Sequence, residues 1–331
     1  MHMHVRGNAH VKGDRVEPGV PSCLAAPPPP APEPRERSSG RRRALAAWIA
    51  NPKNPVTSRV AANRLFQHHF GRGIVASSSD FGELGERPTH QGLLDWLACE
   101  LVDNGWSLKK LHRTIMLSSA YRMSSQADAA ALEKDPANQL LWRFDRRRLT
   151  AEELRDSMLW VAGVLNLKMA GPSFYSRMPP EVLATSSRPN GVWGNSSDEE
   201  RHRRSIYIKV KRSLLTPILS NFDLADTDRA CPVRFNTTTP TQALHMLNGE
   251  FTGLMADAFA RRLTAEHGQD DAARVRRGLA LVTGRQPGDR RVREHLKFLA
   301  DLRSEHALDD HGALKMFCLV CLNANAFMYL D

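Results

Sequence analysis

Side chains able to bind metal or transfer protons gather in one stretch of the sequence, between residues 63 and 95. Histidine titrates near neutral pH and, together with carboxylates, is a common ligand of transition metals. If the two helices predicted to carry this stretch pack side by side, a metal or acid–base centre is geometrically possible. The candidate catalytic residues are Asn63, Arg64, Asp80, His90 and Asp95, and the candidate metal ligands are His68, Asp80 and His90.

The same stretch also has a structural explanation, which is the simpler one. His69 falls on the apolar face of a predicted helix, where a core histidine is expected. Asp80 and Thr89 occupy positions typical of loop and cap residues. Asp95 could pair with Arg64 in a structural ion pair. Both explanations stay open on the sequence alone.

Arg234 is a candidate anion-binding residue because it precedes a predicted helix N-terminus at Thr239. Backbone N–H groups at such an end favour a carboxylate or sulfate. The alternative is an internal salt bridge, which the sequence favours. The helix itself is well specified, since Pro240 suits its first position and Gln242 can reach back to the cap.

Cys318 and Cys321 have the spacing of a redox or haem motif, but position 322 is Leu, so the chain carries no haem attachment motif. With Leu314 they form one apolar helix face, which predicts buried core thiols. A zinc site would need two further ligands at matched spacing, and none is evident. No other cofactor is indicated.

The chain is basic, with a formal net charge of +10 over 331 residues. Lys and Arg cluster at residues 35–43, 143–148 and 201–212. This charge would attract nucleic acid, anionic lipid or acidic polysaccharide alike. No zinc-finger, RNP-like or basic-zipper pattern accompanies it, so nucleic acid is the least favoured partner. The serine-hydrolase elbow, the Walker loop and the dinucleotide glycine motif are also missing.

Apolar residues at helical spacing predict a mainly α-helical fold with a minor β element. We expect a short β segment at residues 1–24, forming a hairpin, and a Pro-rich linker at 25–40. A helical domain should fill residues 41–331, with a long surface loop at about 171–200. Alternation of Ile206, Ile208 and Val210 predicts a strand near 204–212. No apolar run is long enough to span a membrane, and this chain shows no signal peptide.

Several ordered stretches of the chain resemble a known family; they include residues 70–75, 88–90, 93–98, 149–155 and 242–244. The family is the planctomycete-type C-terminal domain of unknown function, DUF1553, also called the planctomycete PSD family. Two departures from its pattern are Phe66, where Trp is common, and Ala326, where an acidic residue is expected. An acid-dependent reaction is therefore in doubt in this chain.

The resemblance implies the C-terminal part of a large exported, extracytoplasmic protein, or a split gene product. It implies partners as well: a cytochrome c-like or other upstream module of the same protein or operon, and acidic or complex polysaccharide. We therefore expect a binding or scaffolding module of a haem-linked assembly. The alternatives are an enzyme with its centre near residues 63–95 and a basic nucleic-acid-binding protein.

Overall fold

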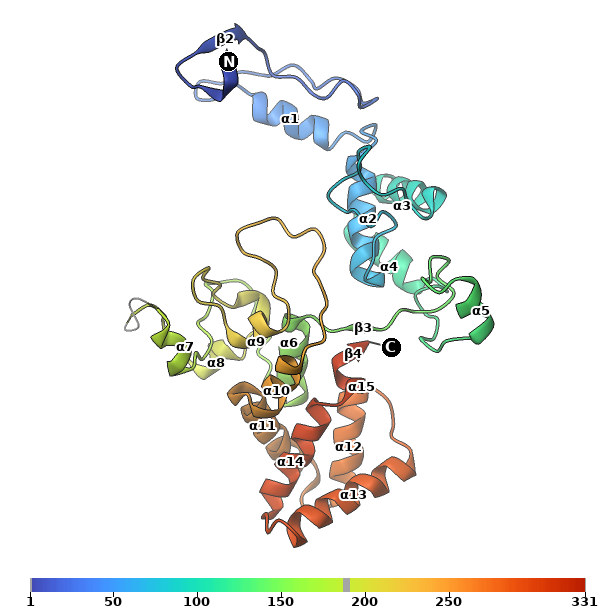
Figure 1. Cartoon of the computed structure of the whole chain (residues 1–331), viewed down its shortest axis with the longest axis vertical. Helices are drawn as coiled ribbons and strands as arrows, with labels where there is room; N and C mark the ends of the chain where they lie inside the picture. The colour runs from blue at the N-terminus through green and yellow to red at the C-terminus, as the bar shows by residue number, and fades with distance from the viewer. Residues whose placement is uncertain (1, 187–190, 331) are drawn as a thin grey trace. The chain divides into compact units, whose positions relative to one another are not determined.

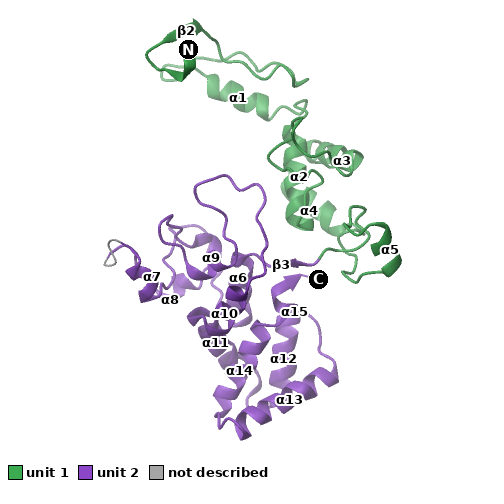
Figure 2. Ribbon diagram, in the orientation of Figure 1, with its two compact units in different colours: residues 1–145 green, residues 146–331 purple. Residues whose placement is uncertain are grey.

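The computed structural model describes residues 2–186 and 191–330. The fold is mainly α-helical with short β elements, as the sequence predicts (Figure 1). The chain forms two compact units, unit 1 at residues 1–145 and unit 2 at residues 146–331 (Figure 2). The domain boundaries expected at residues 24 and 40 stay a prediction. None of the described helices has the length and apolar character needed to cross a membrane.

Unit 1 begins with the predicted hairpin. Strand β1 (His2–His4) pairs antiparallel with β2 (Lys12–Arg15), and a 3-10 turn, η1 (Val5–Gly7), starts the connection. The Pro-rich segment that follows contains no helix. It is fastened to α1 (Arg41–Ile49), because the indole of Trp48 donates a hydrogen bond of 2.9 Å to the carbonyl of Pro27.

The body of unit 1 consists of α2 (Thr57–Phe70), α3 (Gln91–Asp103), α4 (Leu108–Leu117) and the short α5 (Ala129–Lys134). Helix α2 ends at Gly71, whose φ of 80° lies in the left-handed region that glycine adopts readily. Helices α2, α3 and α4 pack against one another. Their apolar faces form a core that includes Ala62, Leu65, Leu94, Leu97, Leu101 and Ile115.

Unit 2 opens with α6 (Ala151–Val161), whose N-terminus forms a capping box. The Glu153 N–H donates to Thr150 Oγ1 (3.3 Å), and the Thr150 N–H donates to Glu153 Oε2 (2.8 Å). The remaining helices are α7 (Pro180–Ala184), α8 (Asp198–Arg201), the 3-10 turn η2 (Ser205–Tyr207), α9 (Pro217–Asn221), α10 (Pro240–Asn248), α11 (Glu250–His267), α12 (Asp271–Thr283), α13 (Asp289–Ser304), α14 (Asp310–Leu322) and α15 (Asn325–Met328).

The core of unit 2 lies where α11 packs along α14, with α12 and α13 beside them (Figure 1). Phe259 and Phe317 are fully buried there. Cys318 and Cys321 are buried in the same core, as predicted, and both are free thiols. Burial raises the pKa of Cys321 to about 12, so this thiol stays protonated and unreactive at neutral pH.

An ion-pair network joins α12, α13 and α14 at the edge of this core. Arg274 is fully buried and places Nη1 2.9 Å from a carboxylate oxygen of Asp310 and 3.3 Å from one of Asp271. Arg303 binds the same two carboxylates, at 2.6 Å and 2.5 Å. The hydrogen bond from Arg303 is the main cause that lowers the pKa of Asp271.

A second small sheet closes unit 2. Strand β3 (Arg147–Arg148) pairs antiparallel with β4 (Tyr329–Leu330), and the Leu149 N–H donates to the Met328 carbonyl (2.8 Å). The sequence does not reveal this sheet, because a strand of two residues is too short to show an alternating pattern.

The strand predicted near residues 204–212 is wrong. The segment forms the η2 turn and contributes isolated bridges, such as the one between Ile208 and Phe174. Its backbone N–H groups are used locally, since those of Tyr207 and Ile208 donate to the carbonyls of Arg204 and Ser205. A lone alternating segment becomes a strand only when an extended neighbour pairs along its length, and here the contact is limited to a few residues around Phe174.

The long loop expected at about residues 171–200 carries the short helices α7 and α8, while residues 187–190 lie outside the described part. Arg203, which is fully buried, holds the start of this loop. Its guanidinium donates to the carbonyls of Lys168 (3.3 Å), Ala170 (2.5 Å) and Pro172 (3.0 Å). Hydrogen bonds from a buried guanidinium therefore hold the start of the loop in place.

Candidate functional site

Asn63, a predicted catalytic candidate, is fully buried in α2 and holds the loop that follows this helix. Its side-chain Nδ2 donates to the Val75 carbonyl (2.9 Å), and its Oδ1 accepts from the Val75 N–H (2.8 Å). A Cβ atom at Gly73 would lie 2.7 Å from Asn63 Nδ2, so this position requires glycine. The amide of Asn63 is thus occupied by the fold.

The other candidates of unit 1 are dispersed. Arg64 and His68 are exposed on α2. Asp80 is exposed in the loop, where its Oδ1 accepts from the Gly82 N–H (2.9 Å), as a loop-capping residue does. His90 places Nδ1 3.2 Å from the Thr89 hydroxyl.

Asp95 pairs with Arg59, at 2.6 Å, and the predicted ion pair with Arg64 is wrong. Arg59 and Arg64 are five residues apart, so at about 100° per residue they point in directions roughly 140° apart. Hydrogen bonds from Gln91 and Arg59 lower the pKa of Asp95. Its carboxylate is therefore ionised and already paired.

The described residues contain no group of three or more His, Cys, Asp or Glu side chains placed to hold a metal ion. His68, Asp80 and His90 thus form no ligand cluster within the part of the chain that the structure describes. Nearby, His69 places Nε2 2.8 Å from His112 Nδ1 and meets the ring of Tyr121 edge-on. This half-buried packing is the structural role that the sequence favours for His69.

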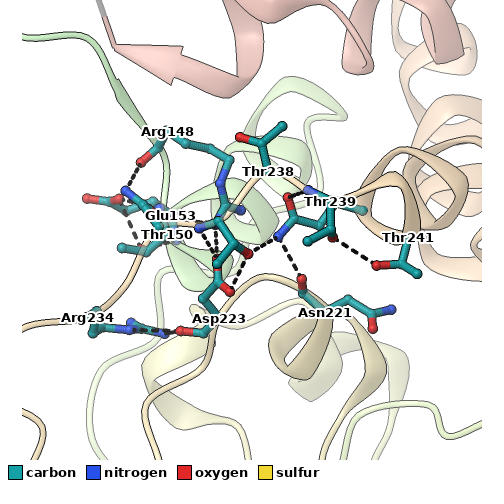
Figure 3. Close-up of polar contacts among 12 residues, drawn as sticks. Arg148, Thr150, Glu153, Asn221, Asp223, Arg234, Thr238, Thr239 and Thr241 are labelled. Atoms are coloured by element: carbon teal, nitrogen blue, oxygen red, sulfur yellow. Dashed lines mark hydrogen bonds and ion pairs between the residues drawn. The ribbon is translucent and has the colours of Figure 1, made fainter.

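A denser polar cluster lies in unit 2 around Asp223 (Figure 3). The Asp223 carboxylate accepts from Arg148 Nη2 (2.5 Å), from the Thr237 N–H (3.0 Å) and from the Thr237 hydroxyl (2.8 Å). Asn236 Oδ1 also accepts from Arg148, at 3.2 Å. Arg148 is only 3% exposed, so Asp223 neutralises a buried cation and fastens the loop that leads into α10.

Arg234, the predicted anion-binding residue, lies on the same cluster (Figure 3). Its Nη1 donates to Glu152 (2.8 Å), and its Nε and Nη2 donate to the Asp223 carbonyl (3.3 and 3.1 Å). These are the contacts of an internal salt bridge, and a bound anion would have to compete with them. Gln242 accepts from the Thr239 N–H (3.4 Å), as its capping role predicts.

A pocket of about 260 Å³ opens in unit 2, lined by residues of α6, α8, α9, α10 and α11 and of the loop before α7. Part of its wall is apolar, and the rest carries guanidinium, imidazole and hydroxyl groups. A pocket with apolar walls and a few converging polar groups is the usual form of a small-molecule site. The apolar lining is Val164, Pro179, Pro217, Ile218, Phe251, Leu254, Met255 and Ala258, and the polar lining is Arg155, Ser176, Arg177, Asp198, Arg201, His202, Thr216, His245, Glu250 and Arg261.

Arg155 is the buried cation of this pocket, at 3% exposure. Its guanidinium carbon lies 5.4 Å from the ring centre of Phe174 and 5.0 Å from that of Phe251. Nη1 donates to the Arg203 carbonyl and the Ser205 hydroxyl, and Nη2 donates to the Arg201 carbonyl. The Nε–H and one Nη2–H have no acceptor within the described residues.

The charge of Arg155 is weakly compensated. The closest carboxylate in the described part of the chain is that of Asp156, at 3.8 Å. That same oxygen already accepts from the Ser205 N–H and hydroxyl, both at 2.7 Å. Burial lowers the pKa of Arg155 to about 10, so the guanidinium remains charged at neutral pH.

The other lining arginines are already in closer ion pairs. Arg177 lies 3.1 Å from Asp198 and 3.5 Å from Glu250, and Arg201 lies 3.0 Å from Asp198. Arg261 pairs with Asp257 one turn earlier on α11. Among the described arginines that line the pocket, Arg155 is therefore the one whose charge is least compensated by a nearby carboxylate.

Two further polar pairs line the pocket. Asn221 Nδ2 lies 3.2 Å from Nδ1 of His245, whose pKa is lowered by burial. The hydroxyls of Ser176 and Thr216 are 2.8 Å apart, and both residues are buried.

These pocket residues are not among the candidates predicted from the sequence, although the sequence contains one signal for them. Arg155 follows Leu154 on the apolar side of α6, next to Met158 and Leu159 of the core, where a charged residue is unusual. His245 lies near the end of α10, and α11 begins after Gly249; on α10 Leu244 is 58% exposed, whereas Met246 is buried.

The fold and the pocket define a two-unit helical protein with a buried arginine in the wall of a pocket in unit 2. Residues 41–299 match the family PSD1, described as a protein of unknown function (DUF1553). This match covers most of the chain, so the chain belongs to that family, as the resemblance of its sequence predicts. No curated protein and no solved structure matches the chain.

Proposed function

We propose that unit 2 is a binding module whose pocket takes a small organic anion, with the anion's carboxylate on Arg155. The observation that carries this proposal is a buried guanidinium that is only weakly neutralised and whose Nε–H and one Nη2–H have no acceptor among the described residues. Removing a cation from water is costly unless an anion compensates it, and arginine binds carboxylates through two parallel hydrogen bonds. The apolar wall suits the body of such a ligand.

The test is calorimetric titration of the full chain with cyclohexanecarboxylate and with its neutral amide, cyclohexanecarboxamide. We expect the carboxylate to bind and the amide to bind at least about tenfold more weakly, since only the carboxylate carries charge. Arg155→Met, which keeps the volume and removes the charge, should weaken carboxylate binding to the same extent. Arg290→Met, at a side chain 90% exposed on α13, is the matched control and should bind like the parent.

A second variant covers the case in which Arg155→Met does not fold, as judged by circular dichroism. Leu254→Trp fills the pocket from α11 without removing any contact of Arg155, and it should abolish binding. Equal binding of the acid and the amide, or binding that survives Leu254→Trp, would overturn the proposed site.

On the family resemblance, we further propose that the anion belongs to an acidic or complex polysaccharide and that the module helps to scaffold a haem-linked, exported assembly. The net charge of +10 supports an acidic partner. Copurification of the full chain with a cytochrome c-like module from the same operon would test the scaffolding role. No retention of that module at low salt would count against it.

A further inference from the structure

We infer that the ligand of this pocket is a hydroxylated carboxylate of the sugar-acid class, and that His245 donates a hydrogen bond to one of its oxygen atoms. The inference rests on the proposed anion site at Arg155 and adds the chemistry of the rest of the ligand. It is carried by polar groups of the pocket other than the guanidinium.

The proton of His245 can be placed from its neighbour. An amide nitrogen can only donate, so Asn221 Nδ2, at 3.2 Å, donates to His245 Nδ1. A neutral imidazole with Nδ1 as acceptor carries its proton on Nε2. Burial lowers the pKa of His245, which keeps the ring neutral at pH near 7.

The resulting Nε2–H has no partner among the residues that the structure describes. The Nε2 atom is buried and makes no hydrogen bond within the described residues. Buried polar groups are nearly always hydrogen-bonded in folded proteins, so an unpartnered donor in a residue that lines a pocket points to a ligand atom. That atom must be an acceptor, such as a hydroxyl, ether or carboxylate oxygen.

The hydroxyls of Ser176 and Thr216 extend the polar lining. They are 2.8 Å apart and only 7% and 6% exposed, and one must donate to the other. The hydrogen of the second hydroxyl is then left for another acceptor. Leu254 and Met255 add an apolar surface to the same pocket. A sugar acid has a carboxylate, hydroxyls around its ring edge and C–H groups on its ring faces, which matches this lining.

The experiment compares D-glucuronate with cyclohexanecarboxylate, which has a carboxylate on a six-membered ring but no hydroxyls. In calorimetric titrations of the full chain we expect glucuronate to bind at least about tenfold more tightly. His245→Phe should remove this preference, and His245→Gln, which restores an N–H donor, should recover part of it. His306→Phe, at an exposed histidine outside the pocket, should keep the preference of the parent.

The outcomes separate this inference from the proposed anion site. If cyclohexanecarboxylate binds the parent as tightly as glucuronate does, the hydroxylated ligand is ruled out while the Arg155 site stands. A preference for glucuronate that survives His245→Phe would overturn the role of His245. If neither carboxylate binds, the inference and the proposed function both fail.

Discussion

The ion pair between Arg148 and Asp223 offers the sharpest test of what holds unit 2 together. Arg148 is 3% exposed, and its Nε and Nη1 atoms have no hydrogen-bond partner in the described part of the chain. Asp223 therefore supplies the compensating charge. Asp223→Asn removes that charge but keeps the size of the side chain. It also suits the backbone, since asparagine tolerates the left-handed conformation found here, with φ at 60°.

The expected magnitude follows from these contacts. Removing one member of a buried ion pair costs roughly 3–5 kcal/mol, because the other charge stays buried. Asparagine retains one acceptor oxygen for Arg148 or Thr237, so we expect the free energy of unfolding of unit 2 to fall by about 2–3 kcal/mol. Asp223→Ala loses that acceptor as well and adds about 1 kcal/mol of left-handed backbone strain. It should therefore cost about 4 kcal/mol in total.

The assay is urea unfolding at neutral pH, followed by hydrogen–deuterium exchange of peptides from residues 146–331, which separates unit 2 from unit 1. Asp228→Asn is the control in the same loop, where the partner Arg212 is 76% exposed and Asp228 is 61% exposed. That surface pair should contribute less than about 0.5 kcal/mol. An Asp223→Asn protein as stable as this control would refute the reasoning.

Three further predictions concern single residues. Asn63→Ala should lower the free energy of unfolding of unit 1 by about 2–3 kcal/mol in urea titrations, because Val75 loses two buried hydrogen bonds; a loss below about 0.5 kcal/mol would contradict this. Folding lowers the pKa of Asp271 below its usual value of 3.8. The ionised carboxylate therefore stabilises the folded state fully above pH 3.8, and this contribution is lost as the pH falls through the lower pKa of the folded state. The free energy of unfolding of unit 2 should therefore be lower at about pH 3 than at about pH 5, and this difference should be smaller in the Asp271→Asn variant. A thiol reagent should label exposed Cys99 quickly and Cys321 only on unfolding; equal rates would disprove the buried thiol.

Local patterns in the sequence were enough to predict the mainly α-helical fold. The capping box at Thr150 and the stop at Gly71 depend on residues within one turn, so the sequence specifies them directly. The apolar face that carries Cys318 and Cys321 is equally local. Such features need no knowledge of distant neighbours.

The features that were not predicted correctly have a different cause, because each depends on residues far away in the sequence. Whether residues 204–212 form a strand depends on an extended neighbour, and the contact at Phe174 is too short to provide one. The partner of Asp95 depends on which turn of α2 faces α3. The pocket combines Arg155, Thr216 and His245, which are far apart in the sequence, so no spacing pattern could reveal it.

The short sheet of β3 and β4 has a consequence for how unit 2 could be handled. Arg147 is the strand partner of Leu330, so the chain enters and leaves the described part of unit 2 at neighbouring points in space. The segment between them begins and ends at one point, this short sheet. Such a unit can be inserted into a host protein, or given new ends by circular permutation, with a short connection across that point.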